Sequence, residues 1–116
     1  MAESTTRITT RITIVCWRDI PAQVIAGQGR GAVKIALPER FEQAIDRCAM
    51  KVGARDADAY LAQWRKRPAG TRPGGDAAAA AAEVAQIVAE YDAARLARLI
   101  AQDGWDLRGA DTGDTL

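Results

Sequence analysis

A two-faced stretch that ends in a polar corner constrains the fold most. From position 8 to 17 one set of alternate residues is mainly apolar, whereas the other starts polar and turns apolar at Val15 and Trp17, and β-branched side chains are in the majority, which is typical of a strand packed on a core. The core-facing positions are Ile8, Thr10, Ile12, Ile14 and Cys16. The chain then passes through Trp17-Arg18-Asp19-Ile20-Pro21. Because Pro21 lacks a backbone donor and must begin a strand or lie at an edge, we predict a tight corner between two strands.

A third strand follows a glycine-rich loop. Residues 22–26 form the predicted second strand, and Gly27-Gln28-Gly29-Arg30-Gly31 a flexible hairpin loop. Residues 32–37 complete an antiparallel three-stranded meander. Glycine loops also bind phosphate, but such loops open a helix, whereas this one leads into a strand.

Helical periodicity begins after Pro38 and predicts a first helix that ends at Gly53. Asp56 is the predicted cap of a second helix, which carries Tyr60, Leu61 and Trp64 inward and ends in the basic residues 65–67. The predicted fold is α+β: a three-stranded antiparallel sheet with helices on one face, followed by a C-terminal helical hairpin and a disordered tail.

Four segments follow from this pattern. Residues 1–67 form the α+β domain, and the Pro- and Gly-rich residues 68–75 form a linker. Residues 76–107 form a helical extension in which Asp76 caps one helix and Asp92 starts another. The Gly-, Asp- and Thr-rich residues 108–116 form the predicted disordered tail.

Composition excludes several kinds of chemistry. The chain has no histidine, which removes Ser-His and Cys-His nucleophile pairs and histidine metal sites. Cys16 and Cys48 lie on apolar faces without metal-ligand spacing, so we expect buried, reduced thiols and no metal or cofactor. No apolar run reaches the roughly 20 residues of a membrane span, and the start lacks signal-peptide features, so we expect a cytoplasmic protein.

Charge is unevenly placed along the chain. Residues 1–72 carry 13 Lys and Arg against 7 Asp and Glu, whereas residues 73–116 carry 3 Arg against 8 Asp and Glu. Either the two halves attract each other, or the basic half meets an anionic ligand or an acidic partner surface.

The corner is the first candidate site. Trp17, Arg18, Asp19 and Gln23 form a polar patch at a sheet end, where Trp17 is a platform and Arg18 reads a carboxylate or phosphate. In the structural alternative, Asp19 caps backbone N–H groups and Trp17 fills the core.

The first helix carries the second candidate site. Arg40, Arg47 and Lys51 fall in one band beside the apolar stripe, which Arg55 would extend, and acidic residues lie on the far side. This band is either a docking surface for an acidic partner or an ordinary solvated face. Nucleic-acid binding is a weaker alternative, because the cluster 65–67 is short and the chain has six aromatic residues.

The corner and the first helix together resemble a known family. Trp17-Arg18-Asp19-Ile20-Pro21-Ala22-Gln23-Val24, Leu37-Pro38-Glu39-Arg40-Phe41-Glu42-Gln43-Ala44-Ile45-Asp46, Lys51-Val52-Gly53 and Asp58-Ala59-Tyr60-Leu61-Ala62-Gln63-Trp64 are similar to the small bacterial "virulence factor" domain, which also occurs in conserved virulence factor C-like proteins. The resemblance covers about residues 8–67. It implies association with folate-dependent and corrinoid one-carbon enzymes.

We therefore expect a non-catalytic accessory domain that docks on a larger bacterial enzyme assembly, with Trp17, Arg18, Arg40, Arg47 and Lys51 in the contact. The competing hypothesis is a small anionic-ligand binder or enzyme that uses Arg18, Asp19 and a low-pKa cysteine.

Overall fold

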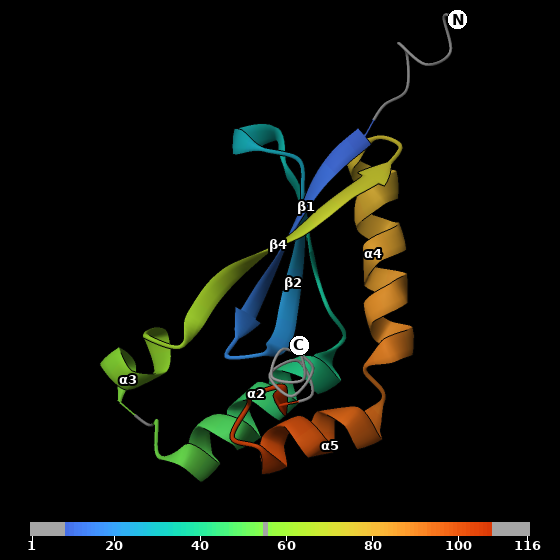
Figure 1. Ribbon diagram of the computed structural model, residues 1–116. Coiled ribbons are helices and arrows are strands. Elements are labelled where there is room, and N and C mark those ends of the chain that lie inside the picture. Colours follow the sequence, from blue (N-terminus) through green and yellow to red (C-terminus); the bar gives the residue numbers. More distant parts are fainter. Residues whose placement is uncertain (1–8, 55, 108–116) are drawn as a thin grey trace, which may run out of the picture.

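The computed structural model describes residues 9–54 and 56–107, which form an antiparallel sheet with helices around it (Figure 1). The strands are β1 (Thr9–Trp17), β2 (Ile20–Ala26), β3 (Val33–Ala36) and β4 (Trp64–Pro73). The helices are α2 (Glu39–Val52), α3 (Ala57–Leu61), α4 (Asp76–Glu90) and α5 (Ala93–Ala101), with a short 3-10 turn, η1 (Gly29–Gly31). The strand order is β3-β2-β1-β4. The α+β class and the β1–β2–β3 meander are confirmed, and the predicted disordered tail lies outside the described residues.

A two-residue turn, Arg18 and Asp19, joins β1 to β2. Arg18 has a φ of 55°, a left-handed conformation that costs a non-glycine residue about 1–2 kcal/mol. Distant segments hold the turn, because the backbone N–H of Arg18 donates to the carbonyl of Gln63 (3.0 Å) and that of Asp19 donates to Gly104 (2.8 Å). Pro21 lies outside the part of β2 that pairs with β3, which covers Gln23 to Ala26. No β3 residue therefore lies opposite Pro21 to accept a hydrogen bond from the backbone N–H that proline lacks.

β4 is the main departure from the sequence-based prediction. Residues 65–67 were predicted to end a helix and residues 68–75 to form a linker, but Trp64–Pro73 pairs with β1 as the fourth strand. Pro68 and Pro73 are compatible with this strand because it lies at the sheet edge, and the register shifts between Pro68 and Thr71. The predicted helix end and the linker are therefore wrong for these residues.

The helices surround one face and one end of the sheet. α4 runs along one face, whereas α2 and α5 cross the lower end in the view of Figure 1 and pack on each other. The predicted C-terminal hairpin is wrong, because α5 turns away from α4 and lies against α2. Asp92 caps α5 as predicted, by accepting from the N–H of Arg95 (2.8 Å). Asp76 does not cap α4, whose N-cap is Gly75; its carboxylate instead accepts from the buried Thr10 hydroxyl (3.2 Å).

The core lies between the sheet, α4, α2 and α5. Its largest fully buried side chains are Trp17, Phe41, Ile12, Ile20, Ile45, Val24, Pro21, Cys16 and Cys48. Ala79 and Ala80 of α4 are buried as well, and their small side chains allow the helix to lie close to the sheet. The alternation of β1 is confirmed, since Ile12, Ile14 and Cys16 all point into this core.

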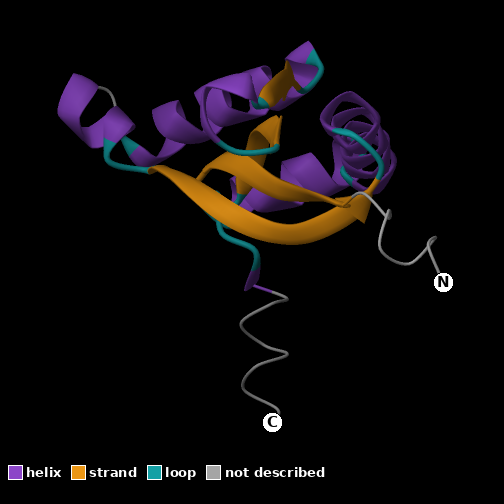
Figure 2. Ribbon diagram, turned by 90° about the horizontal axis from the view of Figure 1, so that it is seen from above, coloured by secondary structure: helices purple, strands orange, loops and turns teal. Residues whose placement is uncertain are grey.

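On the sheet face opposite α4, no described α-helix lies over the part that is uppermost in Figure 1, whereas the face is curved around the helices on its other side (Figure 2). We call it the open face. Its side chains are those of Arg11, Thr13, Val15, Gln23, Ile25, Lys34, Ala36 and Lys66. Cross-strand register aligns them in rows, with Val15 opposite both Gln23 and Lys66, and Ile25 opposite Lys34.

Candidate functional site

The corner binds another part of the same chain. The Arg18 guanidinium donates from Nη1 to the carbonyl of Asp103 (2.7 Å), and Asp19 Oδ2 accepts from the N–H of Asp106 (2.7 Å). The indole of Trp105 lies near two guanidinium groups, those of Arg18 (5.2 Å) and Arg65 (5.5 Å). The segment after α5 therefore occupies the polar surface that the sequence suggested for a ligand.

Trp17 has no exposed surface. Its side chain is 0% exposed, and its indole N–H donates to the carbonyl of Tyr60 (2.9 Å). Asp19 forms an ion pair with Arg65. Of the two interpretations of the corner, these contacts support the structural one. Gln23 is not part of the corner and lies further along β2, on the open face.

Arg40 joins two helices instead of facing solvent. Its Nη2 donates to the carbonyls of Val88 (2.9 Å) and Tyr91 (3.2 Å), at the C-terminal end of α4. The guanidinium also lies 5.0 Å from the centre of the Phe41 ring. A cation at a helix C-terminus interacts favourably with the unpaired carbonyls and the helix dipole. Arg40 therefore has a structural role between α2 and α4.

The other two cations of the predicted band differ from each other. Lys51 forms an ion pair with Asp103 (2.5 Å), and this contact lowers the pKa of the Asp103 carboxyl. Arg47 is exposed and forms no hydrogen bond or ion pair with a described residue. The structure therefore leaves one of the three band residues available for contact. Arg55, the suggested extension of the band, lies outside the described residues.

The thiols are poorly suited to nucleophilic chemistry. Cys16 and Cys48 are both buried and reduced, and burial raises the pKa of each thiol. A raised pKa lowers the thiolate fraction at neutral pH, and the thiolate is the reactive species. This environment is the opposite of what the competing cysteine-based hypothesis needs.

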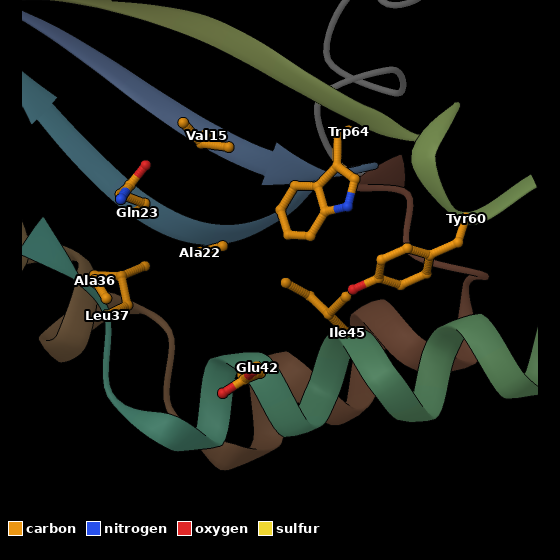
Figure 3. Close-up of a pocket in the computed structure, with 9 residues that line it drawn as sticks. All are labelled: Val15, Ala22, Gln23, Ala36, Leu37, Glu42, Ile45, Tyr60 and Trp64. Carbon is orange, nitrogen blue, oxygen red and sulfur yellow. The ribbon is translucent and has the colours of Figure 1, made fainter. Parts of the chain in front are cut away.

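The open face contains two hollows instead. The lower one, with a volume of about 360 Å³, lies between the sheet and α2 (Figure 3). Tyr60 and Trp64 border it in an edge-to-face pair with ring centres 5.9 Å apart, opposite Ile45 of α2. Its other lining residues are Val15, Ala22, Gln23, Ala36, Leu37 and Glu42. This aromatic pocket is mostly apolar and is shaped to accept an apolar side chain.

The upper hollow has a volume of about 380 Å³ and a different chemistry. Three cations border it, Arg11 from β1, Lys34 from β3 and Lys66 from β4, together with backbone of the glycine-rich loop. Among the residues that the structure describes, no acidic one lines it. We call these three residues the cationic cluster.

Sequence reasoning missed both hollows because it missed β4. Without this strand, Trp64 and Lys66 were assigned to a helix, and their alignment with β1 was invisible. Lys34 could have been found, since the alternation of Val33 and Ile35 with Lys34 and Ala36 places the lysine on the side away from the core.

The described residues contain no cluster of His, Cys, Asp and Glu able to hold a metal ion. Within the same residues, no helix combines the length and apolar character of a membrane span.

These features define a small α+β domain whose sheet is packed on one face and open on the other. The family model described as "Virulence factor" matches residues 15–100, about three quarters of the chain, and the protein belongs to this family. The match extends beyond the predicted resemblance and includes β4 and α4. Comparison with curated proteins and with solved structures finds no match.

Proposed function

We propose that the protein is a non-catalytic interaction module that docks on a larger bacterial protein, and that it does so through the open face. The carrying observation is the aromatic pocket, which Tyr60, Trp64 and Ile45 line where the open face meets α2 and α3. Interaction hot spots are enriched in Trp and Tyr that border desolvated pockets. A partner side chain in this pocket would bury apolar surface on both sides.

The remaining chemistry supports binding over turnover. The described lining of the pocket contains one carboxylate, Glu42, and one phenol, Tyr60, whose pKa is raised by burial and by nearby carboxylates. General acid–base catalysis at neutral pH favours groups with pKa values near the working pH, and a phenol shifted further upward is a poor candidate. The accessory role implied by the family resemblance, including the one-carbon link, is part of this proposal.

We place the docking surface on the open face because most of the residues that the sequence suggested for it, in the corner and in the band on α2, are buried or bound within the chain. Trp17 is buried, and Arg18, Arg40 and Lys51 are all held by contacts within the chain. A partner would have to break these contacts before it could use those groups. The aromatic pocket needs no such rearrangement, because its lining residues already surround an open hollow.

Differential capture from the native cell tests the proposal. The bait is the full chain, as wild type, as Ala36→Tyr, which fills the pocket rim from an exposed strand position, and as Ala82→Tyr, an equal change on the exposed side of α4. We expect quantitative mass spectrometry to find a protein retained by wild type and Ala82→Tyr but lost with Ala36→Tyr. Equal recovery on all three baits, or substrate turnover by the purified chain alone, would contradict the proposal.

A further inference from the structure

The cationic cluster belongs to the same face as the aromatic pocket. Thr13 and Ile25, which line the upper hollow, pair across β1 and β2, and the next pair toward the aromatic pocket is Val15 with Gln23. Ile25 also pairs with Lys34 on β3. On the other side, Lys66 of β4 pairs with Val15, which lines the aromatic pocket. One ligand lying on the open face can therefore reach both hollows.

None of the three cations has a carboxylate partner among the described residues. Lys34 and Lys66 are exposed and form no hydrogen bond or ion pair with a described residue, and Arg11 meets only the neutral amide of Gln28. Elsewhere, by contrast, Lys51 and Arg72 have carboxylate partners. Like charges on one surface repel each other, so the cluster raises the free energy of the unbound protein. An anionic ligand would remove this repulsion.

The spacing indicates the size of that ligand. Lys34 and Lys66 lie on the two edge strands, β3 and β4, with two strands between them. At about 4.8 Å per strand the two edge strands lie about 14 Å apart, and the register offsets Lys66 from Lys34 by two residues along the sheet, so their backbones are about 16 Å apart. An extended chain advances about 3.3 Å per residue, so a segment of about five residues spans this distance.

The chemistry of the two hollows favours a peptide over a nucleic acid. The described lining of the cationic hollow includes no aromatic residue, whereas sheet surfaces that bind single strands combine cations with stacking aromatics. The aromatic residues Tyr60 and Trp64 lie in the other hollow beside Glu42, whose carboxylate would repel a phosphate backbone. A protein segment avoids this conflict by placing an apolar side chain there.

We infer that the open face binds an extended acidic segment of a partner protein, with an apolar anchor in the aromatic pocket and carboxylates on Arg11, Lys34 and Lys66. The inference rests on the proposed function and deepens it, because it states the chemistry of the partner.

Fluorescence anisotropy with the full chain tests the inference. The probe is a labelled peptide of alternating Glu and Ser with one Phe, and the comparison probes are its Glu→Gln analogue and an oligothymidylate of equal charge. We expect the acidic peptide to bind best and increasing salt to weaken it. Lys34→Glu and Lys66→Glu should each weaken it about three- to tenfold, whereas Arg98→Glu, an equal charge change on an exposed α5 residue, should leave it unchanged.

Three results would overturn the inference. They are no binding of the acidic peptide, tighter binding of the oligothymidylate, and equal weakening by Arg98→Glu, which would indicate long-range attraction only.

The proposed function is tested independently of this inference. If Ala36→Tyr abolishes capture of the partner while Lys34→Glu and Lys66→Glu do not, the interaction module stands and its acidic ligand does not.

Discussion

Replacing Arg40 with Ala should destabilise the protein by about 2 kcal/mol, although the sequence places Arg40 in a solvent-facing band. The guanidinium donates to two carbonyls at the end of α4 and lies over the Phe41 ring. Hydrogen bonds that involve a charged group contribute about 1.5–3 kcal/mol, and the helix dipole adds about 0.5 kcal/mol. Because one nitrogen serves both carbonyls and the buried Nε has no partner, we take the lower end of this range.

The change should be visible as a midpoint shift in urea unfolding followed by tryptophan fluorescence, and as a fall in Tm of about 8 °C. Arg47→Ala is the matched control, since Arg47 belongs to the same helix and the same predicted band but contacts no described polar group. It should change the free energy of unfolding by less than about 0.5 kcal/mol. Equal effects of the two substitutions would refute the assignment of Arg40 to the α4 terminus.

Three further predictions concern the glycine after α5, the exposed ion pair and the thiols. Gly104→Ala should cost about 1–3 kcal/mol in thermal or urea unfolding, because φ is +90° and a Cβ would lie 3.1 Å from the Sγ of Cys48; an unchanged Tm would contradict this. Lys51→Met should reduce stability at neutral pH but not in acid: the pKa of Asp103 is lowered by Lys51 in the folded state, so its stabilisation is present above the ordinary carboxyl pKa and is lost as the pH falls through the folded value. Urea titrations across the acid range would measure this, and a difference that persists after protonation would count against the pair. Thiol labelling of Cys16 and Cys48 at neutral pH should be slow and should accelerate in parallel with unfolding in denaturant, because burial raises both pKa values; rapid labelling of the native protein would show an accessible thiolate.

Local signals in the sequence were sufficient for the meander and most helix ends. The alternation of β1 follows from its own side chains, and Asp56 and Asp92 cap helices through hydrogen bonds within three residues. Gly53 ends α2 with a φ of 79°, a conformation that glycine adopts readily. Such features depend on neighbours along the chain and need no knowledge of tertiary structure.

The misassigned segments depend on partners far away in sequence. Trp64–Pro73 has two prolines and little apolar character, and it is a strand because β1 offers it a free edge. Arg40 has helical periodicity typical of a solvated cation, and its carbonyl acceptors lie about fifty positions later. The corner was recognised as special, but its true occupant, the segment around Asp103 and Asp106, could not be deduced from local pattern. The open face was missed for the same reason.

The strand order has a consequence for synthesis on the ribosome. β1 is the inner strand that joins the first hairpin to β4, yet β4 begins 47 positions after β1 ends. Until residues 64–73 have left the exit tunnel, the nascent chain presents an unpaired row of β1 amides and carbonyls, which is a template for pairing with another chain. Slower translation before this segment should therefore favour aggregation, whereas a chaperone that covers β1 during this interval should protect the yield of folded protein.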